Sequence, residues 1–104
     1  MEHDAKWVRR KILLVLQARH PHYVQDDELQ VLLRDQGCTL TARDLASELT
    51  FLHNWPVFDN GYIHMKEIPS KRTAPRGFQS CITPRGLNLL DPSMPDTDEC
   101  VAEF

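Results

Sequence analysis

The side chains best suited to a chemical role lie on one face of the stretch formed by residues 41–53. Arg43, Ser47 and Thr50 follow one another at helical spacing, and Thr41 precedes them. On a helix these short or flexible hydrogen-bonding groups would face base edges and phosphates. An arginine fork pairs well with guanine edges and with phosphate oxygens. The stretch therefore predicts a nucleic-acid contact made by these four residues.

A second set of candidate residues is basic and lies between residues 64 and 86, where the net charge is +4. Residues 69–77 within this region form a loop by composition. Lysine and arginine side chains on this loop and on the strand before it would bind phosphates beside the helix face. The predicted phosphate contacts are Lys66, Lys71, Arg72 and Arg76.

The total charge of the chain does not by itself indicate nucleic acid, because the net charge is −3. Its distribution is more informative. Residues 2–19 carry a net charge of +3, whereas residues 20–63 and residues 91–104 each carry −5. Positive charge is thus concentrated at the first predicted helix and at the basic loop.

Other chemistries find little support in the residue spacings. The chain has no nucleophile motif, phosphate loop or paired-carboxylate signature. Three widely spaced cysteines form no disulfide framework and are expected as free thiols. Histidine and cysteine donors match no compact metal motif such as C-x₂-C; they are His20, His22, Cys38, His53, His64 and Cys81. We therefore expect no catalytic residue, no metal and no cofactor.

The stretch 41–53 must form a helix for its candidate residues to share a face. Thr41 is placed to cap it, and Asp44 stands three residues on, as in a shortened capping box. Apolar residues at i, i+4 and i+7 give this helix a core face. They are Leu45, Leu49 and Leu52.

Two further helices are predicted upstream. Residues 3–19 carry an apolar stripe, with the basic cluster at residues 9–11 on the solvent side. Residues 26–36 follow, with Asp26 as the expected cap. Gly37 suits the left-handed position after a helix. A helix, a glycine-containing turn and a second helix make up the helix-turn-helix arrangement.

Strands and turns are predicted downstream. Residues 57–58 and 62–63 are expected to pair across a tight turn at Asn60-Gly61. Residues 62–68 alternate as a strand and residues 78–82 form the return strand. The basic loop between these two strands would make a wing.

A short helix ends the predicted domain. Thr83 caps it, and Pro84 occupies its first turn, where the missing N–H donor costs nothing. Residues 91–104 hold two prolines and five acidic groups and are expected to form a poorly ordered tail. We therefore place a domain at residues 1–91 and an acidic, disordered tail at residues 92–104.

Together these elements predict an α+β protein with a winged helix-turn-helix fold. Its three-helix core carries a two- or three-stranded wing and a short C-terminal helix. The helix at residues 41–53 takes the position that enters the DNA major groove, and the wing lies on phosphates. The predicted core consists of Val8, Ile12, Leu16, Leu29, Leu33, Leu45, Leu49, Leu52, Ile63, Ile82, Leu87 and Leu90.

Two segments carry a resemblance to a known family. The opening Leu40-Thr41-Ala42-Arg43-Asp44-Leu45 and the closing Ile82-Thr83-Pro84-Arg85-Gly86-Leu87-Asn88-Leu89-Leu90 resemble winged helix-turn-helix regulators. The likeness covers roughly residues 5–90. More narrowly, Leu90-Asp91-Pro92-Ser93-Met94-Pro95-Asp96 is similar to small winged-helix proteins of Mu-like phages and prophages. The resemblance implies a DNA-binding transcriptional regulator of phage or prophage type.

The alternative is a winged-helix adaptor that binds another protein and has no DNA binding of its own. The helix at residues 41–53 carries one basic residue, Arg43, against Asp44 and Glu48. The acidic middle segment also disfavours phosphate contact. Both interpretations stay open at the level of the sequence.

Double-stranded DNA and a second copy of the chain are the expected partners. A homodimer would double the base contacts of one winged helix, and exposed Trp7 and Leu14 of the first helix would form its surface. The longest apolar run, Ile12 to Leu16, is far shorter than the roughly 20 residues that cross a bilayer. Residues 1–4 do not resemble a signal peptide, so a cytoplasmic protein without membrane contact is expected.

Overall fold

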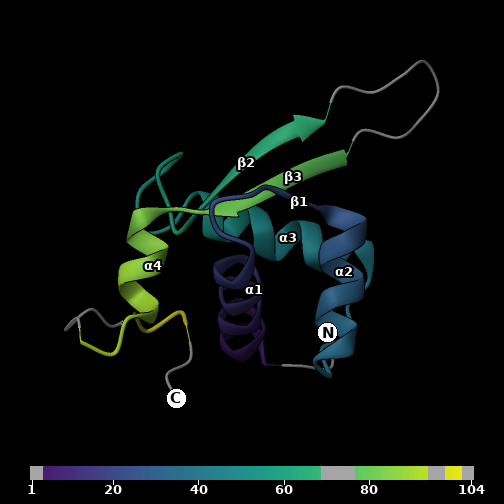
Figure 1. Cartoon of the computed structure of the whole chain (residues 1–104), viewed down its shortest axis with the longest axis horizontal. Coiled ribbons are helices and arrows are strands. Elements are labelled where there is room, and N and C mark those ends of the chain that lie inside the picture. Colours follow the sequence, from purple (N-terminus) through teal and green to yellow (C-terminus); the bar gives the residue numbers. More distant parts are fainter. Residues whose placement is uncertain (1–3, 69–76, 94–97, 102–104) are drawn as a thin grey trace.

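The computed structural model describes residues 4–68, 77–93 and 98–101 (Figure 1). Over these residues the chain is an α+β protein with four helices and one three-stranded antiparallel sheet, as the sequence predicts. No helix among them is both long and apolar enough to cross a membrane. The elements are α1 (Ala5–Arg19), β1 (Val24–Gln25), α2 (Asp26–Asp35), α3 (Ala42–His53), β2 (Ile63–Ile68), β3 (Gly77–Ile82) and α4 (Pro84–Leu90).

The sheet has the strand order β1-β3-β2, so the last strand in the sequence is the central one. Ile63 lies opposite Ile82 in the β2–β3 pair, and Val24 lies opposite Ser80 in the β1–β3 pair. Helices α1, α2 and α3 lie below this sheet in Figure 1, and α4 continues from the end of β3. This arrangement is compatible with a small winged-helix-like fold.

Polar caps begin the helices largely as expected. The Thr41 hydroxyl accepts a hydrogen bond from the Asp44 N–H at 3.1 Å, and the Thr83 hydroxyl accepts one from the Gly86 N–H at 3.2 Å. The prediction for α2 is wrong, because Gln25 holds the cap position and Asp26 is the first helical residue. The Asp26 carboxylate instead accepts a hydrogen bond from the Phe78 N–H at 3.2 Å and thereby joins α2 to β3.

The turn between α2 and α3 has the predicted geometry. Gly37 adopts φ of +80°, the left-handed region that glycine enters without steric strain. The Cys38 N–H then bonds back to the Leu33 carbonyl at 2.9 Å, which satisfies a carbonyl at the end of α2. The chain is thus redirected into α3 within a few residues.

The hydrophobic core matches the predicted residues closely. All of them are buried except Leu87, which is partly buried and packs against the core. Further buried residues come from irregular segments and short strands, where no helical or alternating pattern marks them. They include Val24, Cys38, Leu40, Tyr62 and Val101.

The hairpin expected around Asn60-Gly61 is absent from the described structure. Residues 54–61 fold back onto the end of α3, where the Gly61 N–H bonds to the His53 carbonyl at 3.0 Å and the Tyr62 N–H to the Leu52 carbonyl at 2.9 Å. A Cβ atom at Gly61 would lie 2.1 Å from the Leu52 carbonyl oxygen. Glycine is therefore needed here for close backbone approach and not for a hairpin turn.

Arg9 was expected on the solvent side of the first helix, and the structure places it between two helices. Its Nε atom donates to a Glu48 carboxylate oxygen at 2.7 Å, and its guanidinium lies 3.7 Å from the Phe51 ring centroid. The Glu48 side chain is buried, with 9% of its surface exposed. A buried carboxylate requires such a partner, and the pair joins α1 to α3.

The described part of the tail also differs from the prediction. Residues 98–101 pack on the domain, and Val101 is only 4% exposed. The Asp98 carboxylate accepts hydrogen bonds from Trp55 and Tyr62. The composition of this segment predicts a solvated tail. It does not reveal that Val101 packs in the core or that Asp98 has hydrogen-bond donors elsewhere in the fold.

The core position of Leu49 on α3 provides a test of the helix orientation. Leu49→Ala should lower the free energy of unfolding by about 2–5 kcal/mol, because it removes a fully buried side chain and leaves a cavity. Chemical denaturation measures this loss. Ala46→Ser, on the exposed face of the same helix, is the control and should change stability by less than about 0.5 kcal/mol.

The close approach at Gly61 gives a second test. Gly61→Ala should lower the free energy of unfolding by more than about 1 kcal/mol, because the new methyl group meets backbone carbonyl oxygens of Leu52 and Trp55. Asn60→Ala, at an exposed neighbouring position, serves as the control in the same denaturation experiment. An unchanged stability of the Gly61 variant would contradict the backbone packing described for this loop.

Candidate nucleic-acid interface

The exposed face of α3 carries the residues that the sequence singles out. Arg43, Ser47 and Thr50 are all exposed, on the side of the helix opposite Leu45 and Leu49. Among the residues that the structure describes, no carboxylate forms an ion pair with Arg43, so its guanidinium is available to a ligand. The Thr50 hydroxyl donates to the Ala46 carbonyl at 2.8 Å and keeps its lone pairs for an incoming donor.

Thr41 has a structural role that limits its part in binding. Its hydroxyl accepts the Asp44 N–H and thereby satisfies one free donor at the start of α3. Arg43, Ser47 and Thr50 therefore present their side chains to solvent from one face of α3. Thr41 instead caps the first turn of the helix, the turn that carries Arg43.

Lys66 is the one predicted wing residue within the described structure. It is exposed on the sheet face that points away from the helices, while Ile63 and Met65 pack toward the core. Its ammonium group lies 4.2 Å from the Tyr23 ring centroid, a cation–π contact. Lys71, Arg72 and Arg76 lie outside the described residues.

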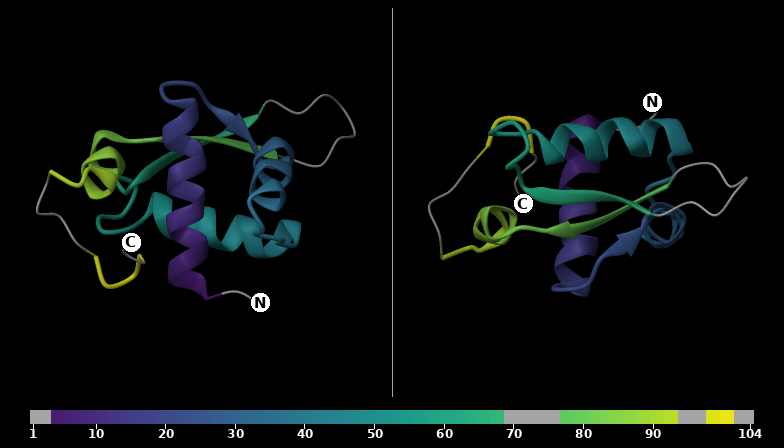
Figure 2. Two further views of the ribbon diagram at one scale, coloured as in Figure 1. Left: turned by 60° about the horizontal axis from the view of Figure 1, so that its bottom comes forward. Right: turned by 90° about the horizontal axis from the view of Figure 1, so that it is seen from above.

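Arg43 and Lys66 lie toward the same end of the molecule, and no contact between the α3 candidates and Lys66 is seen in the described residues. The N-terminal end of α3, which carries Arg43, and the last residues of β2 point toward the same end of the long axis in both views of Figure 2. A ligand that contacts both would have to span from the helix to the sheet hairpin.

The edge of β2 and the outer sheet face bring His53 and His64 close to Tyr23, a residue that the sequence analysis did not associate with them. Tyr23 and His64 make an edge-to-face contact with ring centroids 6.2 Å apart, and the His53 and His64 rings are 5.7 Å apart. Burial raises the pKa of Tyr23, and the neighbouring Cys81 thiol raises it further. Over the described residues no group of three or more His, Cys, Asp or Glu side chains is placed to hold a metal ion.

His53 has a specific structural role at this edge. Its Nδ1 atom accepts a hydrogen bond from the Met65 N–H at 3.3 Å, and its Nε2 atom lies 2.7 Å from an Asp59 carboxylate oxygen. The network assigns the proton of the neutral imidazole to Nε2. The ring thus joins the last turn of α3 to the free edge of β2 and to the loop between them.

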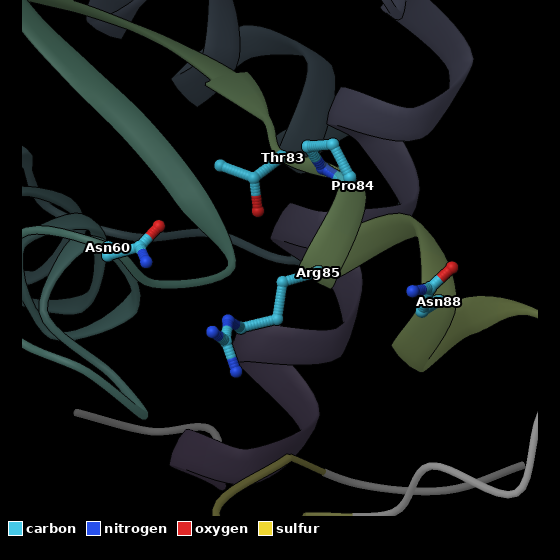
Figure 3. Close-up of a pocket in the computed structure, with 5 residues that line it drawn as sticks. All are labelled: Asn60, Thr83, Pro84, Arg85 and Asn88. Carbon is cyan, nitrogen blue, oxygen red and sulfur yellow. The ribbon is translucent and has the colours of Figure 1, made fainter.

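A hollow lies at the opposite end of the molecule from the start of α3, between the 54–61 loop and α4 (Figure 3). It is an open pocket of about 400 Å³ lined by Asn60, Thr83, Pro84, Arg85 and Asn88. The Thr83 hydroxyl has no proton left to donate, because it donates to the Gly61 carbonyl at 2.8 Å while it accepts from the Gly86 N–H. The remaining polar groups are one guanidinium and two amides, which suit binding rather than catalysis.

No family model, curated protein or solved structure matches this chain. Function is therefore inferred from the geometry of these surfaces.

The capping role of Thr41 predicts how its replacement will act. Thr41→Ala should lower the free energy of unfolding by about 0.5–2 kcal/mol through loss of the cap. Thr41→Ser keeps the hydroxyl and should recover most of that stability. Thermal or chemical unfolding compares the variants, and a fully stable Thr41→Ala protein would show that the cap contributes nothing to α3.

Proposed function

We propose that this protein is a DNA-binding winged-helix protein, a transcriptional regulator of phage or prophage type. In this proposal α3 enters the major groove, and the hairpin of β2 and β3 lies along the phosphate backbone. The observation that carries it is the exposed face of α3, where Arg43, Ser47 and Thr50 stand together without a core contact. The likeness of residues 5–90 to winged helix-turn-helix regulators supports the same assignment.

The connection between α2 and α3 supports this orientation. The turn at Gly37 sets α3 against α2 in the manner of a helix-turn-helix, in which the second helix is the one that reads the groove. The side of α3 that bears Leu45, Leu49 and Leu52 is buried, so only the opposite side is free to meet DNA.

The electrostatics of α3 are more favourable than its sequence suggests. Glu48 counts against phosphate contact in the sequence, but its carboxylate is buried and paired with Arg9. Asp44, the other carboxylate of the helix, is half-buried. The exposed face is therefore free of the Glu48 charge, and a phosphate beside Arg43 meets only the partly buried Asp44 among the carboxylates of this helix.

A protein-interaction adaptor is the second candidate, and it is favoured by a different observation. Val57 and Phe58 in the loop after α3 are 47% and 82% exposed. Adjacent exposed apolar side chains are typical of interaction surfaces. A single exposed arginine on α3 would also give modest DNA affinity on its own.

Homodimer formation through α1 stays a proposal. The apolar surface that α1 exposes for it is smaller than the sequence predicts. Trp7 and Leu14 were expected to be exposed on the first helix, but both are partly buried and pack against the core. A dimer through α1 would have to use the remaining edges of these side chains.

Binding to duplex DNA at two salt concentrations tests the proposed function. Arg43→Ala should weaken binding by about 1–3 kcal/mol, mostly on a preferred sequence if the guanidinium reads a base. Replacing Lys71 and Arg72 with Ala should weaken binding on all sequences and flatten the salt slope by up to about two units. Fluorescence polarisation measures both effects.

Arg85→Ala is the matched control for charge, because Arg85 is an exposed arginine on α4, at the opposite end of the molecule from the start of α3 (Figure 1). It should leave affinity nearly unchanged. Absence of duplex binding by the wild-type protein at low salt would overturn the proposal and favour the adaptor. An unchanged salt slope in the Lys71 and Arg72 double variant would remove the wing as a phosphate contact.

A further inference from the structure

The described residues of the tail, 98–101, are held by a carboxylate anchor. One oxygen of Asp98 accepts a hydrogen bond from the Trp55 indole N–H at 2.8 Å and another from the Tyr62 hydroxyl. The second oxygen accepts the Cys100 N–H at 2.8 Å, which folds the segment into a tight turn. Three donors thus converge on one acidic side chain.

These donors favour the charged form of the carboxylate. Burial alone would raise the pKa of Asp98, but hydrogen bonds from Tyr62, the Cys100 N–H and Trp55, with the charge of Arg9, outweigh burial and lower the pKa. The site is therefore suited to an ionised acidic group and disfavours a neutral substitute.

A second anchor is formed by the backbone of the same segment. Arg9 donates from Nη1 to the Cys100 carbonyl at 3.0 Å while its Nε atom holds Glu48. The Arg9 guanidinium lies over the Phe51 ring, which stacks on Trp55 at a centroid distance of 5.4 Å. The groups that bind the segment are thus packed against one another and preorganised.

A third anchor is apolar. The side chain of Val101 belongs to the hydrophobic core cluster and is 4% exposed. The segment therefore offers a carboxylate, a backbone carbonyl and an aliphatic side chain within four consecutive residues. A peptide with this pattern would supply the same three contacts, whichever chain it came from.

The receiving surface is formed by elements remote in sequence from the tail. It combines α1, the end of α3 and the loop after α3, and Figure 2 shows residues 98–101 in yellow beside that loop. The same loop continues to the exposed side chains of Val57 and Phe58. The bound segment thus leaves apolar surface uncovered next to its own site, which a longer ligand would bury.

We propose that the surface formed by Arg9, Trp55 and Tyr62 is a receptor site for a short acidic peptide of a partner protein. The peptide carries a carboxylate followed three residues later by an aliphatic side chain, and residues 98–101 occupy the site in cis. A partner must displace them, so its apparent affinity is reduced by the high effective concentration of the attached segment. The site is independent of the proposed DNA face.

Nuclear magnetic resonance on the full chain tests this proposal. The probe is a synthetic, unlabelled peptide of residues 96–104 with Cys100→Ser, which prevents oxidation. The receptor is the isotope-labelled Asp98→Asn protein, whose own segment has lost its charged anchor. The peptide should shift the Trp55 indole N–H signal saturably, and Trp55→Phe identifies which of the two tryptophan signals this is.

Two controls define the specificity. A peptide carrying Asp98→Asn in addition should bind about tenfold more weakly or worse, because it lacks the charged acceptor. The wild-type protein should bind the acidic peptide about tenfold more weakly than the Asp98→Asn protein, because its own segment competes. Equal binding of the two peptides, or no saturable shift at millimolar peptide, would overturn the proposal.

A measurement on the wild-type protein guards against misfolding of the Asp98→Asn protein. Excess unlabelled peptide should move the labelled Val101 methyl signals from buried toward solvent-exposed positions as the segment is displaced. Val101 signals that stay unchanged at the highest peptide concentration would show that the segment is a fixed part of the fold and would overturn the receptor proposal. The assay contains no DNA, so its result is separate from the DNA-binding test.

Discussion

Arg9 is the residue on which the assembly of this structure most depends, because it joins three parts of the chain that are distant in sequence. One nitrogen neutralises the buried Glu48 of α3, another binds the Cys100 carbonyl, and the guanidinium plane covers Phe51. A carboxylate buried between helices is strongly destabilising when its partner is missing. The position of α1 against α3 is therefore coupled to the position of residues 98–101.

The C-terminal end of α3 is determined by a second set of contacts. Gly61 and Tyr62 donate their N–H groups to carbonyls of the last turn, and His53 accepts from the free edge of β2. These bonds satisfy helix-end carbonyls that would otherwise require water. They also establish the orientation of α3 relative to the β2–β3 hairpin, and hence where Arg43 and Lys66 stand with respect to each other.

Arg43 of the proposed DNA face and the proposed peptide site lie at opposite ends of α3. Arg43 lies in its first turn, whereas Trp55 follows its last, and about 15 Å of helix axis lies between Arg43 and the end of α3 at 1.5 Å per residue. A peptide at Trp55 would therefore leave the exposed face at Arg43 uncovered. The same helix would connect a contact with DNA at one end to a contact with protein at the other.

Local patterns in the sequence were sufficient to predict the helices and most of the core. Leu45, Leu49 and Leu52 identify a buried face because one helical turn relates them, and Thr41 and Thr83 act on N–H groups three residues away. The exposed position of Arg43, Ser47 and Thr50 follows from the same periodicity. Such features depend on neighbours along the chain and can be read without the fold.

Only the tertiary structure determined the contacts between distant residues. Arg9 pairs with Glu48 across 39 positions, and Trp55 meets Asp98 across 43, while many other charged and polar groups were equally available in the sequence. Gly61 illustrates the same limit. The dipeptide Asn60-Gly61 predicts a hairpin turn, and only the fold shows that carbonyl oxygens of Leu52 and Trp55 lie close to Gly61. Long-range partners depend on how the helices cross and on which polar groups the core excludes from water, and neither is encoded in a local pattern.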